Sequence, residues 1–467
     1  MKTILFIVNH SAQLKAPLKL ILLLKENLNY KPLVYLNFSG GWNLWKEVEI
    51  CQKNQIHFIC DTEGQKQLEK GIDKGSEATS PYFSTVKNRE PSFKDRIKLF
   101  LLDFFSILVI VRFLNKKIKE LEKILIANEI SILVLPEDAY GVHPLFNKAA
   151  KKLNIPTVLI PFTKSNHLEV LNDYQLVEVN GLNRLYCYIS PKWEILYKDR
   201  FYMPFSLLKA LTLDIVKVSP LNPFVLMGGR ADLMLVENED DIHYYQEAGI
   251  NLKKMLKTGA IYQDTFHHII FNYEERKAEL FKRYNILCSK PVILCTLFPV
   301  ATPINDEYGV YDYGTVENAI SFWLKPLLEC NQFQLWVHPH PRTNINFIKY
   351  LEGWHLKVMY EPIETILPFC DIHISGTSAT TRMSLTLGKP ILCYTDNYVF
   401  TDLEKFKGTV TVKTRAEYVN LIAKLKSDFS FFEKLKEEAK ANIELFGPMD
   451  GKSGERILKV FESIKPI

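Results

Sequence analysis

The sequence lacks the cysteine spacing of a disulfide scaffold or a zinc site. Its eight cysteines are scattered, and no two of them form a CxxC pair. Several lie inside apolar runs, as Cys295 does at the end of Val-Ile-Leu-Cys. Buried single cysteines behave as small apolar residues. We therefore interpret them as core residues of a protein in a reducing compartment, and we expect neither disulfides nor a bound metal.

A large excess of charge of one sign is also missing. The 58 basic and 53 acidic side chains leave a net charge of only +5 over 467 residues. Such a diluted excess does not indicate a nucleic-acid partner, although it suits an anionic substrate or a lipid surface. The length is too great for one typical core and predicts two domains.

No apolar run is long enough for a membrane span. The run at the N-terminus stops at Asn9, and no cleavage site of small residues follows, so it predicts a buried first strand in a cytoplasmic protein. Residues 99–114 are apolar at 13 of 16 positions. A span needs roughly 20 residues. We interpret the segment as a buried or dimer-facing helix, which leaves a homodimer open. The alternatives are a helix lying on the inner membrane surface and a transmembrane helix.

Short apolar runs alternate with helical patterns along most of the chain, which predicts parallel sheets covered on both faces. The first series of expected strands comprises residues 4–8, 33–36, 56–60, 132–135 and 157–160. The second comprises residues 233–236, 292–297, 333–337, 356–359, 372–374 and 391–394. Two series predict two doubly wound α/β domains.

The expected organisation follows from the composition between these strands. We predict an N-terminal domain over 1–225, a C-terminal domain over 226–445, and a final helix in 446–467 that packs back towards the N-terminal domain. Residues 190–228, with four prolines, are interpreted as the interdomain connection. The polar segment 61–94 is interpreted as a mobile loop or an insertion.

The strongest functional pattern follows the expected strand 372–374. Ser375, Gly376, Thr377, Ser378 and Thr380 lead from this strand into a helix expected over 381–387. Hydroxyls and free backbone N–H groups at a helix N-terminus favour an anion such as phosphate. An ordinary helix cap is the alternative, but a cap needs only one hydroxyl.

A second pattern follows the expected strand 333–337. His338, His340 and Arg342 lie in a loop stiffened by two prolines, and together they can donate to a phosphate or to a departing group that gains charge. A surface turn is the alternative. Glu361, which precedes a further expected helix, is a candidate acceptor for ribose hydroxyls.

The third pattern lies in the N-terminal half. Glu137 and Asp138 follow the expected strand 132–135. A carboxylate at this position can take a proton from an acceptor hydroxyl if its surroundings raise its pKa. An acidic helix cap before residues 144–153 is the alternative.

These motifs resemble those of bacterial surface-polysaccharide glycosyltransferases. The His338-Pro339 loop followed by the cluster 375–380 is similar to the paired motifs of bacterial sialyltransferases and capsule 3-deoxy-manno-octulosonate (Kdo) transferases. The entry to the C-terminal half, 232–259, also looks like that of UDP-N-acetylglucosamine 2-epimerases. The resemblance covers roughly residues 130–160 and 230–460. It implies the GT-B fold, with two Rossmann-like domains that face a central cleft.

The resemblance also implies a function. His338, His340 and Arg342 would contact the nucleotide and assist its departure, the 375–380 turn would hold the phosphate, and Asp138 or Glu137 would act as base. This describes a metal-independent, inverting transferase without cofactor, which moves a sugar from a CMP- or UDP-linked donor to a capsule or lipopolysaccharide glycan or a lipid-linked acceptor. A sugar-nucleotide 2-epimerase and a CDP-polyol phosphotransferase remain as alternatives.

Overall fold

The computed structural model describes residues 1–40, 43–70, 93–164, 176–197, 199–286, 290–297, 313, 316–340, 351–354, 356–376, 378–395 and 402–465. For 68–70 and 93–105 it describes the backbone only. The chain forms two compact units. Unit 1 comprises Met1–Val236, Asp241–Ile261 and Gly454–Ile467, and unit 2 comprises Glu237–Asp240 and Tyr262–Ser453. The chain first leaves unit 1 after Val236 and leaves it again after Ile261. The domain boundary expected at 225/226 therefore lies before both of these positions.

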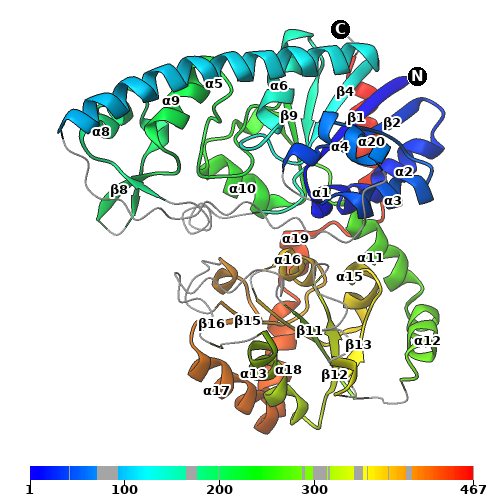
Figure 1. Ribbon diagram of the computed structural model, residues 1–467. Coiled ribbons are helices and arrows are strands. Elements are labelled where there is room, and N and C mark those ends of the chain that lie inside the picture. Colours follow the sequence, from blue (N-terminus) through cyan, green and yellow to red (C-terminus); the bar gives the residue numbers. More distant parts are fainter. Residues whose placement is uncertain are drawn as a thin grey trace. The chain divides into compact units, whose positions relative to one another are not determined.

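Unit 1 is built on a seven-stranded parallel sheet with the order β10-β9-β5-β4-β1-β2-β3 (Figure 1). Its strands are β1 (Lys2–Val8), β2 (Tyr30–Leu36), β3 (His57–Cys60), β4 (Ile130–Leu135), β5 (Thr157–Leu159), β9 (Leu233–Val236) and β10 (Met255–Lys257). Alternate residues of β1 enter different cores: Ile4 and Phe6 pack on one face and Leu5 and Ile7 on the other. The five strands expected here are confirmed.

The helices of unit 1 cover both faces of this sheet. They are α1 (Ser11–Lys15), α2 (Leu18–Glu26), α3 (Trp45–Lys53), α4 (Thr62–Lys70), α5 (Phe93–Ala127), α6 (His143–Lys152), α8 (Gly181–Ile189), α9 (Leu207–Val216) and α20 (Ser453–Ser463), with the short turns η1 (Phe38–Gly40), η2 (Pro191–Trp193) and η3 (Leu252–Lys254). α10 (Glu239–Glu247) begins in the short segment of unit 2 and continues in unit 1.

Three expectations for this half of the chain need correction. Residues 233–236 belong to the first sheet, because β9 pairs with β5; strand–helix alternation does not reveal which sheet a strand joins. The region 190–228 is folded, with α9 and part of a three-stranded antiparallel sheet. That sheet has β6 (Val177–Glu178), β8 (Arg200–Met203) and β7 (Ile195–Tyr197) in this order. Within 61–94, residues 62–70 form α4, and 71–92 lie outside the described residues.

Residues 99–114 are part of one continuous helix, α5. Its side chains are described from residue 106 onward; Leu108, Val109 and Phe113 are exposed, whereas Val111 and Leu114 pack partly buried against the core of unit 1. In the described part of the chain, no helix combines the length and the apolar character that crossing a bilayer requires.

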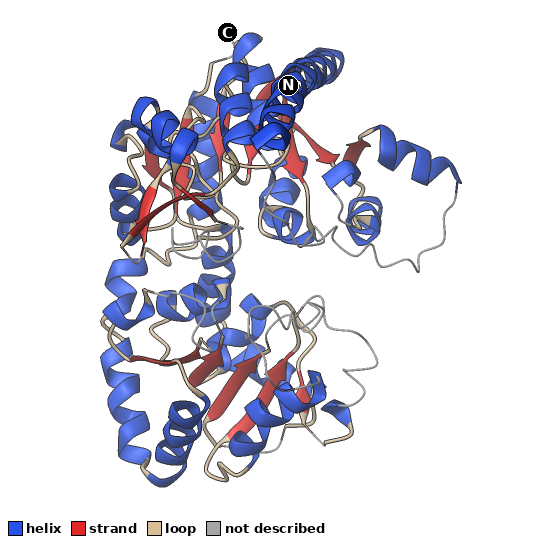
Figure 2. Cartoon of the chain, turned by 60° about the vertical axis from the view of Figure 1, so that its left-hand side comes forward, coloured by secondary structure: helices blue, strands red, loops and turns tan. Residues whose placement is uncertain are grey.

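Unit 2 repeats the same winding with the strand order β13-β12-β11-β14-β15-β16, all parallel. Its strands are β11 (Val292–Thr296), β12 (Gln334–His338), β13 (Lys357–Val358), β14 (Ile372–Ser375), β15 (Ile391–Tyr394) and β16 (Thr409–Val412). Helices lie on both sides of the sheet (Figure 2). The strands expected here are again confirmed. In the two parallel sheets, β16 of unit 2 and β10 of unit 1 are strands that the sequence pattern did not predict.

The helices of unit 2 are α11 (Ile261–Phe271), α12 (Tyr273–Arg283), α13 (Val316–Leu328), α15 (Ile363–Ile366), α16 (Ala379–Thr386), α17 (Arg415–Ser427), α18 (Phe429–Ala439) and α19 (Asn442–Phe446), with the turns η5 (Leu367–Phe369) and η6 (Leu403–Lys405). Alternate residues of β11 again divide between two cores, with Ile293 on one face and Leu294 on the other. The seven described cysteines are buried thiols, as expected for core residues.

The C-terminal helix α20 completes the core of unit 1. Ile457 and Phe461 are buried against residues of β1, and the Nζ of Lys2 donates to the carbonyl of Phe461 at 2.8 Å. The first strand and the last helix are therefore joined, and both termini lie together (Figure 1).

We expect Phe461→Ala to destabilise unit 1 by about 3–5 kcal/mol, because it leaves a cavity in a closed core. Urea unfolding followed by circular dichroism would measure the change. Lys459→Ala, at an exposed position of the same helix, is the control and should have little effect. An equal loss in both variants would contradict the role of Phe461.

Candidate functional site

The winding of unit 2 reverses between β11 and β14. From β11 the chain moves outward to β12 and β13, then returns to β14 on the other side of β11. In open parallel sheets ligands bind beyond the carboxyl ends of the strands at this reversal. Thr296, at the end of β11, is in register with His338 of β12 on one side and with Ser375 of β14 on the other. The two loops singled out in the sequence therefore start at the same edge of the sheet.

A chain of buried hydrogen bonds lies directly behind this edge. The Oγ1 of Thr296 donates to the Oγ of Ser375 at 2.8 Å and lies 2.9 Å from the Nε2 of His373. The Nδ1 of His373 lies 2.7 Å from the Oγ of Ser384 on α16. All four side chains are at most 5% exposed. The network joins β11, β14 and α16 through side chains.

Because each hydroxyl has a single proton, the donor and the acceptor of each hydrogen bond in this network can be assigned. Thr296 has one hydroxyl proton, and it is donated to Ser375. The Nε2 of His373 then carries the proton that Thr296 accepts, and Nδ1 is left as an acceptor facing the Ser384 hydroxyl, whose oxygen also lies 3.3 Å from the carbonyl of Thr380. The proton of the Ser375 hydroxyl is not needed within the chain. Ser375 therefore has a hydroxyl proton for which this network supplies no acceptor.

His373 is held in its neutral form. Burial, with a smaller contribution from the charge of His338, lowers the pKa of His373 to about 3. A neutral imidazole has one donor and one acceptor nitrogen, as the hydrogen bonds to Thr296 and Ser384 require. A charged imidazolium would have two donors and could not accept from Ser384.

The turn after β14 carries the expected helix start. Ser378 is the N-cap of α16, and its side chain accepts from the backbone N–H of Thr380 at 3.3 Å. One hydroxyl thus serves as an ordinary cap. A Cβ at Gly376 would have only ordinary contacts, both at 3.7 Å, so packing alone does not demand glycine there. Thr377 lies outside the described residues.

The loop after β12 is tied to Glu361. The Nε2 of His338 donates to the carbonyl of Glu361 at 3.0 Å, and His340 is partly buried two residues further on. Although burial acts in the opposite sense, hydrogen bonds from Tyr284 and Arg283 lower the pKa of Glu361. This carboxylate is thus already engaged by two side chains. Arg342 lies outside the described residues.

Unit 1 also has a polar cluster where its winding reverses, between β1 and β4. The Nδ1 of His143 lies 3.0 Å from the Oε1 of Glu137, which also accepts from the Nε2 of Gln13 at 3.2 Å. The Nδ2 of Asn9 lies 3.4 Å from the same imidazole nitrogen. The side chain of Glu137 is 11% exposed, and that of His143 is fully buried.

Some polar atoms of this cluster are unused within the described residues. The Oδ1 of Asn9, the Nε2 of His143 and both side-chain polar atoms of Asn147 are buried and have no hydrogen-bond partner there. Asn147 lies one helical turn after His143 on α6. Native proteins rarely leave buried polar atoms unsatisfied. The cluster therefore retains capacity for hydrogen bonds to a bound molecule.

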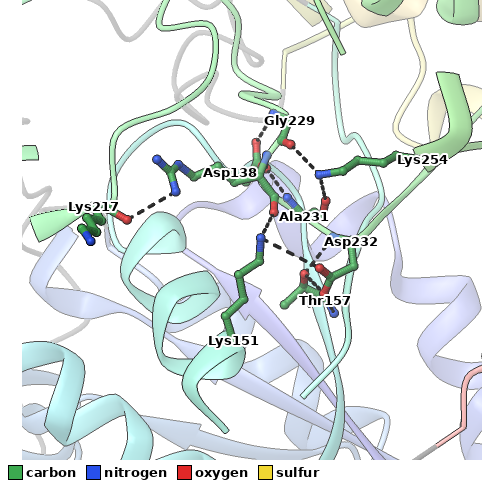
Figure 3. Close-up of polar contacts among 9 residues, drawn as sticks. Asp138, Lys151, Thr157, Lys217, Gly229, Ala231, Asp232 and Lys254 are labelled. Carbon is green, nitrogen blue, oxygen red and sulfur yellow. Dashed lines mark hydrogen bonds and ion pairs between the residues drawn. The ribbon is translucent and has the colours of Figure 1, made fainter. Parts of the chain in front are cut away.

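Asp138 has a different role from its neighbour Glu137. It is fully buried, and its carboxylate accepts from the backbone N–H groups of Gly229, Arg230 and Ala231 at 3.2, 2.5 and 2.8 Å (Figure 3). Burial raises the pKa of Asp138, and the backbone amides oppose this rise. Both oxygens are occupied by the turn before β9. This geometry makes Asp138 a positioning residue for that turn.

The same turn is held from two further sides. The Nζ of Lys254 donates to the carbonyls of Gly229 and Ala231 at 3.0 and 2.9 Å, and Lys151 donates to the carbonyl of Arg230 (Figure 3). The glycines at 228 and 229 thus form a fixed turn of unit 1. In the described residues, no group of three or more His, Cys, Asp and Glu side chains is placed to hold a metal ion.

Sequence reasoning missed Thr296, His373 and Ser384. The signal that could have found His373 is its position two residues before Ser375 in a short apolar strand, because alternate strand residues share a face. No local pattern marks Thr296 or Ser384, which reach the network from another strand and from a helix.

We expect His373→Gln to flatten the acid dependence of unit 2's stability. The pKa of His373 is lower in the folded chain than its ordinary value of about 6.5, so between these values the unfolded chain binds a proton that the folded chain does not. Stability should fall as pH drops below about 6.5, by roughly 2 kcal/mol at pH 5 from this group alone. Urea unfolding at pH 7 and pH 5 would test it; equal losses in both proteins would contradict it.

No protein-family model matches the chain, and no curated protein matches it. Solved structures do resemble it over nearly its full length. They include MnaA of S. aureus with UDP (14% identity, TM-score 0.52, covering 100% of this chain and 98% of that chain). UDP-GlcNAc 2-epimerase from Neisseria meningitidis bound to UDP-GlcNAc has 13% identity and a TM-score of 0.53, covering 99% and 100%. The wall teichoic acid polymerase TagF has 12% identity and a TM-score of 0.51, covering 99% and 88%.

Identities this low establish a shared fold and nothing more specific. The expected fold class, two doubly wound Rossmann-like domains of the GT-B type, is confirmed by the two parallel sheets and by these neighbours. The narrower resemblance to capsule Kdo transferases and sialyltransferases stays a prediction.

Proposed function

We propose that this protein is a glycosyltransferase whose unit 2 binds the nucleotide-activated sugar. Ser375, Gly376, Thr377, Ser378 and Thr380 hold the phosphate, and His338, His340 and Arg342 contact the nucleotide and assist its departure. Glu361 serves this site through its backbone carbonyl, which fixes His338. The acceptor is a surface glycan or a lipid-linked precursor.

One observation carries the proposal: Thr296 is flanked by His338 and Ser375 at the point where the sheet reverses its winding. Neighbouring strands are roughly 5 Å apart, so the imidazole loop and the hydroxyl turn begin within roughly 10 Å of each other across β11. A phosphate group between them would receive the Ser375 hydroxyl, the amides of the α16 N-terminus and the imidazole donors.

These donors support transfer without a metal ion. As the sugar leaves the donor, the bond from its anomeric carbon to the phosphate oxygen breaks, and the phosphate takes the electron pair. Fixed hydroxyls, amides and imidazoles neutralise that developing charge without reorganising. The nucleotide base stays open between CMP- and UDP-linked donors.

We assign the base to Glu137 in preference to Asp138. Both oxygens of Asp138 accept from backbone amides, whereas Glu137 is slightly exposed and is held by His143 and Gln13. Glu137 would take the proton of the acceptor hydroxyl while that oxygen attacks the anomeric carbon, which inverts its configuration. His143 orients the carboxylate.

A 2-epimerase is the second candidate, and the observation that favours it is the acid–base pair Glu137–His143, which could equally remove a proton from a sugar carbon. The likeness to epimerase structures fits this reading. A CDP-polyol phosphotransferase remains the third reading.

Two assays separate these functions. A thermal-shift screen of CMP, UDP, GDP and CDP identifies the nucleotide, because a ligand at 100 times its Kd stabilises by about 2.7 kcal/mol. The corresponding sugar nucleotide is then incubated alone and with candidate acceptors. Release of nucleotide that depends on acceptor supports the transferase. Formation of the 2-epimer without acceptor would replace it with the epimerase, and no shift with any nucleotide would refute donor binding.

We expect Thr296→Val to raise the Kd of the nucleotide about fivefold or more. The substitution keeps the shape of the side chain but removes the hydroxyl that fixes Ser375, a loss of about 1 kcal/mol or more. Isothermal titration calorimetry would measure the Kd. Thr409→Val is the control, because Thr409 starts β16 at the opposite edge of the same sheet. Similar affinities in both variants would contradict a role of the buried hydrogen-bond network in nucleotide binding.

We expect Glu137→Gln to lower the rate of transfer by at least about a hundredfold, since general base catalysis contributes on the order of 10²–10⁴. The Kd of the nucleotide should not change, because its binding is assigned to unit 2. Glu47→Gln, at another buried glutamate of unit 1, is the matched control. Full activity of Glu137→Gln in a folded protein would refute the assignment.

A further inference from the structure

Helix α5 has one face that the fold of unit 1 uses. Ile118, Leu121 and Leu125 are at most 1% exposed and pack in the same core as residues of α6 and α9. The helix extends along the rim of the unit, with α6 and α9 on the same side of it (Figure 1). Its other face therefore requires a separate explanation.

That outer face carries a stripe of cations. Arg112, Lys116, Lys119 and Lys123 follow the spacing i, i+4, i+7 and i+11, which places them along one side of a helix, and all four are exposed. Within the part of the chain that the structure describes, none of the four is in an ion pair. The nearby acids are engaged elsewhere: Glu120 with Lys117 at 3.7 Å, and Glu122 with Lys152 at 2.7 Å.

Large apolar side chains adjoin the N-terminal end of this stripe. Leu108 is 47% exposed, Val109 65% and Phe113 62%. Leu108 and Val109 lie one turn before Arg112 and Phe113. An exposed helix face that combines basic and apolar residues is typical of helices that lie in a membrane interface.

We propose that the outer face of α5 binds the surface of an anionic lipid bilayer. The four cations would meet the headgroup phosphates, with their long stems along the interface, and Leu108, Val109 and Phe113 would enter the boundary with the acyl chains. Nucleic acid would use the cations but would leave the apolar side chains in water, which makes it the poorer partner. The proposal is independent of the activity of the protein.

Binding of the full-length protein to vesicles tests the proposal. Co-sedimentation is measured with vesicles of phosphatidylglycerol and phosphatidylcholine, with vesicles of phosphatidylcholine alone, and with duplex DNA as a soluble polyanion. We expect binding to the mixed vesicles that weakens with salt, little binding to phosphatidylcholine, and weaker binding to DNA. Each cation should contribute about fivefold, equivalent to about 1 kcal/mol.

Two variants separate the two parts of the face. The combination Arg112→Gln, Lys116→Gln, Lys119→Gln and Lys123→Gln should lower vesicle binding by roughly several hundredfold. Val109→Ser with Phe113→Ser should also weaken vesicle binding but leave binding to DNA unchanged. The control combines Lys46→Gln, Lys53→Gln, Lys66→Gln and Lys459→Gln, which remove the same charge from exposed sites of unit 1 outside α5.

The circular dichroism of all variants should match that of the parent protein, because every substituted side chain is exposed. The proposal is overturned if the parent protein does not bind the mixed vesicles, if it binds phosphatidylcholine or DNA equally well, or if the control loses as much binding as the α5 variant.

Discussion

The hydroxyl of Thr296 is the contact on which the candidate donor site depends. It ends the central strand β11, accepts from the buried imidazole of His373 and donates to Ser375, while its backbone pairs with β12 on the other side. A hydroxyl with a single proton, placed between two fixed partners, can donate in only one direction. Because the network behind it is buried, that direction is set by the fold and not by solvent.

The two units share one plan and differ in what lies at the reversal of the winding. In unit 2 this edge carries hydroxyls, imidazoles and a helix N-terminus, a set that favours an anion. In unit 1 it carries Glu137, His143 and two asparagines with unused hydrogen-bonding atoms, a set that favours hydroxyl or amide groups and proton transfer. The nearby carboxylate of Asp138 instead holds the turn before β9. The two adjacent carboxylates thus have different partners, because neighbouring residues of the chain face different surroundings.

Much of the architecture could be predicted from local patterns. Apolar runs of β-branched residues mark buried parallel strands, and every strand expected from them is present. The hydroxyl-rich turn and the imidazole loop could be located because both follow such strands. The pairing of β9 with β5 could not be predicted, since pairing depends on contacts between segments distant in the chain. The spacing of the cations on α5 is a local pattern, but which face of that helix stays exposed depends on its packing against α6 and α9.

By itself, the sequence determined the doubly wound fold class and the positions of the two candidate loops, because hydrophobic period and strand ends are local properties. Only the tertiary structure decided which residues act together. It brought Thr296, His373 and Ser384 into one network from two strands and a helix, separated the surroundings of Glu137 and Asp138, and turned one face of α5 outward. Burial and hydrogen-bond partners arise from packing across the whole unit, and no short stretch of sequence contains that information.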